Sequence, residues 1–88
     1  MDNEIMQKLL EQLWFQSDNC SSPIENAWFL IQETSKITGT KGQVVRDHFD
    51  KLIEGKIIEK ISDEPLLFQF TDTGRKVKSS SDVEKYVA

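Results

Sequence analysis

The chain contains one cysteine, one histidine and no long apolar run. Because Cys20 has no second cysteine to pair with, it can form neither an intrachain disulfide nor a cysteine-based zinc site. His48 has no second histidine as a partner, and it lies in a different predicted element from Cys20, so neither metal binding nor nucleophilic catalysis is indicated. Gly39 and Gly42 lie too close together to frame a phosphate-binding loop. We therefore expect no enzyme activity, no metal site and no cofactor.

The sequence also lacks the segments that direct a chain into or across a membrane. No apolar run approaches the roughly 18 residues of a membrane-spanning helix. The opening MDNEIMQ has neither the basic start nor the apolar stretch of a signal peptide. A single free thiol fits a reducing compartment. We expect a cytoplasmic protein that does not bind a membrane, and 88 residues allow one domain at most, either a whole protein or a part of a longer one.

Positive charge is scarce in the first third of the chain and better represented afterwards. The net charge is −4, and the isoelectric point is near 4.9. Residues 1–35 carry one lysine against six acidic residues, whereas residues 36–88 carry ten Lys and Arg against nine acidic residues. An acidic total speaks mildly against non-specific binding of a polyanion. Most of the negative charge, however, belongs to the N-terminal third.

The spacing of apolar residues predicts three helices, at about residues 3–16, 23–35 and 41–54. The first helix has one apolar face. The second is apolar most of the way round, because Phe29 and Leu30 project away from the face that its other apolar residues share; such a helix is buried on several sides or covered by a partner. The third is expected to direct four apolar residues inward: Val45, Phe49, Leu52 and Ile53.

Polar residues before each helix are the expected N-caps, namely Asn3, Ser22 and Thr40. Pro23 suits the first position of the second helix, and Glu25 follows Ser22 by three residues, as in a capping box. These local signals place the start of the second helix at residue 23.

Two strands are expected after the third helix, at about residues 56–62 and 66–70, with Asp63, Glu64 and Pro65 forming the turn. Gly55 stands where the end of the third helix favours a left-handed residue. Further helical turns are predicted over residues 72–87.

This order of elements, and the phrase FTDTGR at residues 70–75, resemble the winged helix-turn-helix family. Many small prokaryotic repressors of that family end the wing with a similar phrase. In this chain the resemblance implies that Thr71 caps the next turn and that Gly74 permits close approach to the sheet. The resemblance implies a single α+β winged helix-turn-helix domain over residues 1–88, with a three-helix core, a two-stranded β-wing and a short C-terminal helix.

The resemblance further implies a small DNA-binding protein, a transcriptional regulator that places residues 40–54 in the major groove of double-stranded DNA. The candidate contacts are Thr40, Lys41, Gln43 and Arg46 on the helix, and Lys56, Lys60, Arg75, Lys76 and Lys78 along the DNA backbone. Asp47, Asp50 and Glu54 share the outer side of the helix and repel phosphate unless they are paired. That side is therefore also open to interpretation as an ordinary solvated surface or as a protein-binding face centred on Val44.

An alternative function is that of a winged-helix module which binds a protein in a larger assembly and does not bind DNA directly. Apolar residues that a three-helix core does not obviously use support this alternative, and they also suit a homodimer interface. The candidate interface residues are Phe15, Phe29, Leu30, Val44 and Tyr86. A core larger than expected would account for the same residues.

Overall fold

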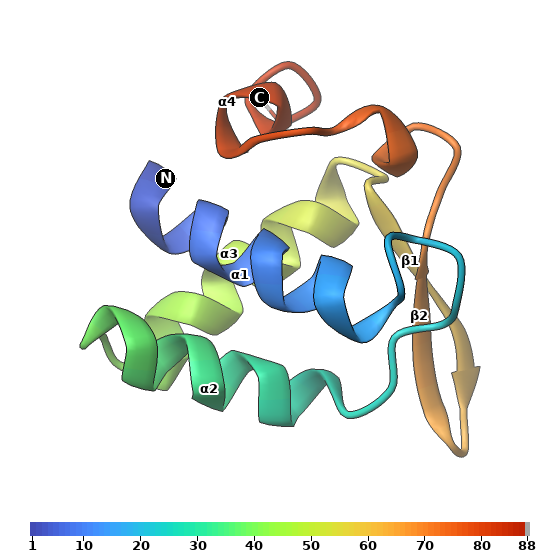
Figure 1. Cartoon of the computed structure of the whole chain (residues 1–88), viewed down its shortest axis with the longest axis horizontal. Helices are drawn as coiled ribbons and strands as arrows, with labels where there is room; N and C mark the ends of the chain where they lie inside the picture. Colours follow the sequence, from blue (N-terminus) through green and yellow to red (C-terminus); the bar gives the residue numbers. More distant parts are fainter. Residues whose placement is uncertain (88) are drawn as a thin grey trace.

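The computed structural model describes residues 1–87, in which helices precede a β-hairpin and a short C-terminal helix (Figure 1). The elements are α1 (Asn3–Gln16), α2 (Ala27–Thr38), α3 (Gly42–Glu54), β1 (Ile58–Asp63), β2 (Leu66–Phe70), the 3-10 turn η1 (Gly74–Lys76) and α4 (Ser80–Val83). The strands form a two-stranded antiparallel sheet. The α+β class is thus confirmed, and the layout is compatible with that of a winged helix.

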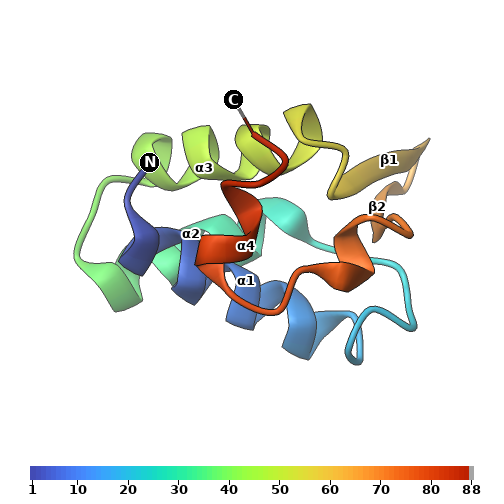
Figure 2. The same ribbon diagram turned by 90° about the horizontal axis from the view of Figure 1, so that it is seen from above.

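The core lies where α1 packs against α2, α3 and α4 (Figure 2). Five residues of the α1 stripe are buried there: Ile5, Met6, Leu9, Leu10 and Leu13. Burying a side chain of this size stabilises the fold by about 1.5–3 kcal/mol. The predicted bounds of α1 are those observed, since its apolar spacing matches one helical face.

The start of α1 is tied to α3 through the one histidine. Asp2, and not Asn3, is the N-cap: its Oδ1 accepts hydrogen bonds from the backbone N–H groups of Glu4 and Ile5 at 2.9 and 3.1 Å. The Asp2 N–H donates to His48 Nε2 at 3.0 Å, while His48 Nδ1 lies 2.7 Å from the Val44 carbonyl oxygen. A proton on Nδ1 satisfies both contacts, so this buried imidazole serves to join two helices.

Residues 23–26 are extended, so the predicted start of the second helix at residue 23 is wrong. Ile24 forms an isolated antiparallel bridge with Phe68, with N–H to oxygen distances of 2.7 and 3.1 Å. The Ile24 side chain is fully buried. Asn26 then adopts a left-handed conformation with φ 54°, and α2 begins at Ala27. The bridge to β2 and the burial of Ile24 outweigh the local capping box at Ser22.

The turn between α2 and α3 differs from expectation at its polar residues. The left-handed residue Gly39, with φ 68°, ends α2, so this helix extends beyond the predicted limit at residue 35. Lys41 occupies the N-cap position of α3, whereas the Thr40 hydroxyl lies 2.6 Å from that of Thr38. Thr40 is therefore not the N-cap, because its hydroxyl contacts the Thr38 hydroxyl within the turn.

After α3 the left-handed residue is Lys56, with φ 60°, and not Gly55, with φ −79°. Gly55 is needed for a different reason. A Cβ there would lie 2.8 Å from Val87 Cγ2 and 3.3 Å from the Tyr86 carbonyl oxygen. The glycine thus lets the C-terminal segment pack closely on the end of α3.

The hairpin pairs Ile58 with Phe70 and Asp63 with Leu66, and its register is irregular near Ile61. Its strands lie within two residues of the predicted limits. The turn after β2 has the predicted role: Thr71 Oγ1 accepts a hydrogen bond from the Gly74 N–H at 2.9 Å. A Cβ on Gly74 would overlap the Ile57 carbonyl oxygen, so only glycine fits here.

Two inferred positions in the core are also corrected. Leu30 is 4% exposed and belongs to the core, whereas Ile53 is 37% exposed. Leu30 is buried because the inward stripe of α2 is Ala27, Leu30, Ile31 and Thr34, which are spaced by three and four residues. The predicted helical turns over residues 72–87 are interrupted, since η1 and α4 are separate short elements and Val77 between them is extended.

Candidate functional site

The outer side of α3 carries a mixture of basic, acidic and apolar side chains. Its inner side buries Val45, His48, Phe49 and Leu52. The exposed residues of the helix and its N-cap are Lys41, Gln43, Val44, Arg46, Asp47, Asp50, Ile53 and Glu54. Three of the four predicted base-reading residues are therefore accessible, while Thr40 is half-buried in the turn.

Two of these accessible residues are held by neighbours. The Arg46 guanidinium carbon lies 4.5 Å from the ring centroid of Trp28 on α2, which is a cation–π contact. Trp28 in turn meets the buried Phe49 edge-on at 6.0 Å between centroids. Gln43 Nε2 donates to Asp47 Oδ1 at 2.9 Å. Arg46 is thus oriented by an aromatic surface, and Asp47 is engaged by an amide.

Neither Asp47 nor Asp50 forms an ion pair that would offset its repulsion of phosphate within the described residues. Over residues 1–87 the ion pairs are Lys8–Glu11, Lys36–Glu33, Lys60–Asp63 and Lys85–Asp82. Lys60, a predicted contact to the DNA backbone, is therefore bound to Asp63 at the hairpin tip, with 2.7 Å between Nζ and Oδ1. The tip presents exposed acids to solvent.

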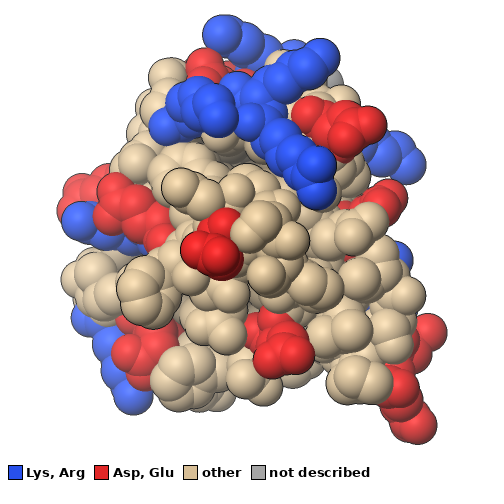
Figure 3. Space-filling model, turned by 45° about the vertical axis from the view of Figure 1, so that its right-hand side comes forward, with Lys and Arg blue, Asp and Glu red and all other residues tan. Residues whose placement is uncertain are grey.

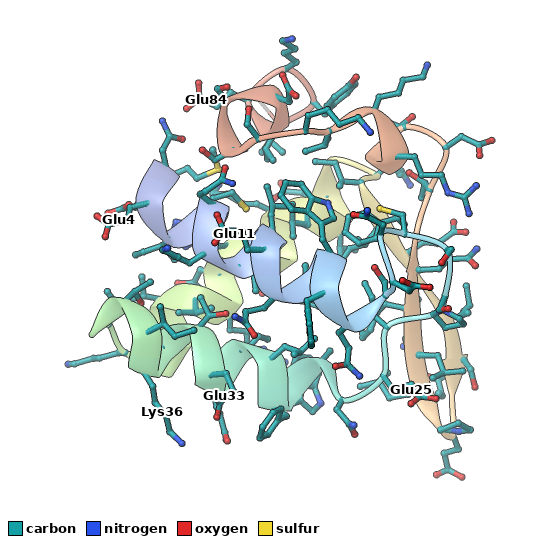
Figure 4. The ribbon with its side chains drawn as sticks, viewed as in Figure 1. Glu4, Glu11, Glu25, Glu33, Lys36 and Glu84 are labelled. Atoms are coloured by element: carbon teal, nitrogen blue, oxygen red, sulfur yellow. The ribbon has the colours of Figure 1, made fainter. Side chains whose placement is uncertain are left out.

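The negative charge of the first two helices lies on their outer surfaces. Figure 4 shows Glu4 and Glu11 pointing outward from α1, and Glu33 and Lys36 projecting from α2. In the view from above, α1 and α3 lie on opposite sides of the molecule (Figure 2). The acidic residues of α1 are consequently directed away from the outer side of α3.

Basic residues gather at the base of the hairpin, in the segment that follows β2. Figure 3 shows Lys and Arg side chains together at the top of the molecule, where Figure 1 places this segment. Arg75, Lys76 and Lys78 are all exposed, and none of them is in an ion pair within the described chain. The predicted DNA contacts therefore lie in separate places. Arg75, Lys76 and Lys78 lie beyond the C-terminal end of α3, and Lys41 lies at its start.

A pocket of about 720 Å³ opens beside these basic residues; we call it the base pocket. It is lined by Trp14, Asn19, Cys20, Ser21, Arg75, Val77 and Lys78. Burial raises the pKa of the Cys20 thiol above its ordinary value, and the positive charges of Lys78 and Arg75 partly oppose that rise. Neither the pocket nor its tryptophan is signalled by the spacing of residues in the sequence, because its walls come from distant segments.

A second pocket, of about 450 Å³, lies at the hairpin tip; we call it the tip pocket. Its walls are Glu25, Asn26, Ala27, Trp28, Phe29, Pro65, Leu66 and Leu67. Phe29 is 58% exposed and Trp28 is 43% exposed. The chain thus leaves two large aromatic side chains in contact with water beside an apolar turn.

The candidate interface residues come from separate elements and differ in exposure. Phe15 is 86% exposed at the end of α1, and Phe29, Val44 and Tyr86 are also exposed. Leu30 is buried and is therefore wrong as a surface anchor. Phe15, Val44 and Phe29 lie on three different helices.

Comparisons with protein families, with curated proteins and with solved structures gave no match for this chain. Within residues 1–87, none of the helices combines the length and the apolar character that crossing a lipid bilayer requires. No three His, Cys, Asp or Glu side chains of these residues are grouped so that they could hold a metal ion. The fold and the geometry of the surfaces are therefore the grounds for a functional proposal.

Proposed function

We propose that this chain is a small DNA-binding protein, a transcriptional regulator that inserts α3 into the major groove of double-stranded DNA. The observation that supports this most is the position of α3, with Lys41, Gln43 and Arg46 exposed near its start and the acidic surface of α1 on the opposite side. An α-helix fits the major groove, and residues near the N-terminus of the reading helix contact base edges.

Each of these residues has a contact suited to its chemistry. Arg46, already oriented by Trp28, offers a planar fork for guanine O6 and N7. The Gln43 amide suits adenine when its hydrogen bond to Asp47 is replaced by hydrogen bonds to the base. Lys41 is placed to meet phosphate at the start of the helix, and Lys56 and Lys76, which are exposed and do not line the base pocket, are further candidates for phosphate contacts. Asp50 and Glu54 oppose binding, so we expect modest affinity.

The test is fluorescence anisotropy of a labelled random-sequence DNA duplex at two salt concentrations. The wild-type protein should bind at low salt and lose affinity steeply as salt is added. The double variant Lys41→Glu and Arg46→Glu should lose at least about 100-fold in affinity, since two attractive phosphate or base contacts become repulsive.

The matched control is Lys8→Glu with Lys36→Glu. It changes the net charge equally, on the outer surfaces of α1 and α2. It should bind DNA much more tightly than the α3 variant does. If both double variants bind alike, α3 is not the DNA-contacting element, and absence of wild-type binding at low salt would remove the proposal.

A second candidate function, association with a protein partner or with a second copy of the chain, is favoured by the exposure of Phe29 beside Trp28 and Leu66 in the tip pocket. Sedimentation velocity over a range of protein concentrations tests the homodimer. If this surface forms it, Phe29→Asp should dissociate the dimer. Ile37→Asp, at an equally exposed apolar position of the same helix, should not. A wild-type protein that is monomeric throughout would exclude the homodimer.

A further inference from the structure

The base pocket has a charge unlike that of the rest of the chain. Arg75 and Lys78 line it, and none of its other lining residues is acidic. The tip pocket is lined by Glu25, and a third pocket, beside Lys56 and Arg75, is lined by Glu59 and Asp72. In a protein whose net charge is −4, two cations around one concavity without an acid make a local site for an anion.

One wall of the base pocket is a rigid, left-handed loop. Asp18, Asn19 and Cys20 have φ values of 49°, 59° and 72°, a conformation that non-glycine residues rarely adopt. The fully buried Ser17 holds the loop: its Oγ accepts a hydrogen bond from the Cys20 N–H at 3.1 Å, and its carbonyl oxygen accepts one from the Ser22 N–H at 2.8 Å. Asn19 and Ser21 therefore line the pocket on a loop that is held by hydrogen bonds, and the Ser21 hydroxyl itself donates to the Asp18 carbonyl oxygen at 2.6 Å.

The opposite wall is fixed by close packing. Gly74 lies directly against the Ile57 carbonyl group, and Val77 is buried in the core with 2% exposure. The Lys78 N–H donates to Asp82 Oδ2 at 2.8 Å. Arg75 and Lys78, on either side of Val77, are thus attached to a backbone that is held at several points.

The remaining wall is the half-buried indole of Trp14, which packs against the core. A flat aromatic surface stacks with another ring, guanidinium and ammonium groups attract an anion, and the Asn19 amide is a hydrogen-bond donor on the loop. We propose that the base pocket is a binding site for a small aromatic anion, a ring that carries a phosphate or a carboxylate. The ring stacks on Trp14, and the anionic group lies between Arg75 and Lys78.

The first probe is phenyl phosphate, and its binding is monitored through the fluorescence of Trp14 in a Trp28→Phe background. Phenyl phosphate should change the emission saturably. Phenol, which has no charge, and inorganic phosphate, which has no ring, should each bind at least about tenfold more weakly, a difference of about 1.4 kcal/mol. The double variant Arg75→Gln and Lys78→Gln should weaken phenyl phosphate by a similar factor, and the matched variant Lys8→Gln and Lys36→Gln should not.

A second measurement is independent of the ligand chosen, because Cys20 is the only thiol of the chain. The rates of its alkylation by anionic iodoacetate and by neutral iodoacetamide are compared in the folded and the urea-unfolded protein. Folding should raise the iodoacetate-to-iodoacetamide rate ratio several-fold, since the pocket attracts the anionic reagent. Arg75→Gln with Lys78→Gln should return the ratio to that of the unfolded chain.

A rate ratio that is unaffected by folding would overturn the site, and so would phenyl phosphate binding that Arg75→Gln with Lys78→Gln leaves unchanged. The site does not rest on the proposed DNA function. Lys41→Glu with Arg46→Glu should abolish DNA binding and leave both readouts at Trp14 and Cys20 intact.

Discussion

The two ends of the β-hairpin are both flanked by a tryptophan-lined pocket, yet they differ in charge. The pocket at the base is lined by Trp14, Arg75 and Lys78 and by no acidic residue. The pocket at the tip is lined by Trp28, Phe29 and Glu25. Asp63 at the tip holds Lys60 in an ion pair, whereas the base cations have no such partner within residues 1–87. The base therefore suits an anion, and the tip suits an apolar surface.

This contrast bears on how a winged-helix layout would meet DNA. A wing that contacts DNA through its tip needs basic residues there, because phosphate contacts supply most of the affinity. Here the tip is acidic and the free cations lie at the other end. In the proposed complex, DNA contact consequently falls to α3, and the hairpin serves mainly to complete the core through Phe68 and Phe70.

The largest expected effect comes from disrupting the packing at the base. Gly74→Ala should destabilise the protein by at least about 3 kcal/mol, because its Cβ would overlap the Ile57 carbonyl oxygen and the backbone must move. Gly42→Ala is the control: it meets nothing within 4 Å at the start of α3 and should be neutral or stabilising by about 0.5 kcal/mol. Urea denaturation measures both, and equal stabilities would contradict the close approach.

Next in size is the difference between adjacent residues beside the tip. Leu30→Ala should cost about 2–4 kcal/mol in unfolding free energy, since Leu30 is 4% exposed in the core. Phe29→Ala should cost less than about 1 kcal/mol, since Phe29 is 58% exposed. The same denaturation experiment applies. A Phe29 cost as large as that of Leu30 would mean that the tip pocket is part of the core and not an open surface.

The elements of the fold also differ in how far the sequence predicts them. The limits of α1, the third helix, the hairpin and the Thr71–Gly74 turn follow from local signals: apolar spacing on one helical face, turn residues between two apolar strands, and a threonine three residues before a glycine. In each case the residues that carry the signal are close together in the sequence. The α+β order was therefore predictable.

The start of α2 was not predictable, because the residue that decides it is distant. Ile24 is extended by pairing with Phe68, and helix formation from Pro23 onward would break that bridge. The buried stripe of α2 runs through Ala27, Leu30 and Ile31, so Leu30 lies in the core and Phe29 outside it. The candidate site divides in the same way: exposure of Lys41 and Arg46 followed from helical spacing, whereas the base pocket assembles Trp14, Cys20 and Arg75 from segments far apart in sequence.

A smaller effect separates the base cations from α3 in DNA binding. Lys41→Gln with Arg46→Gln should reduce the slope of log affinity against log salt by about 0.9, because Lys41 is assigned to a phosphate and Arg46 to a base. Arg75→Gln with Lys78→Gln should reduce it by less than about half of that, because these cations line the base pocket. Equal reductions would show that DNA covers the base as well, and phenyl phosphate would then compete with DNA.

The smallest expected effect concerns the carboxylate that closes the base segment. The hydrogen bond from the Lys78 N–H, and then the ammonium of Lys85 at 3.2 Å, hold the pKa of Asp82 below its ordinary value of 3.8. A carboxyl whose folded pKa is lowered contributes stability above its unfolded pKa and loses it as pH falls through the folded pKa. The contribution of Asp82 is therefore complete at neutral pH and disappears on the acid side of pH 3.8.

Asp82→Asn should accordingly be less stable than the wild type at pH 7, and the two proteins should converge as the pH is lowered below 3.8 in denaturation experiments. Glu84→Gln is the matched control, because Glu84 follows α4 directly, projects outward in Figure 4 and forms neither contact. A difference between Asp82→Asn and the wild type that stays constant with pH would mean that the carboxylate charge is not what holds Lys78. In that case the base pocket would keep its shape through Gly74 and Val77 alone.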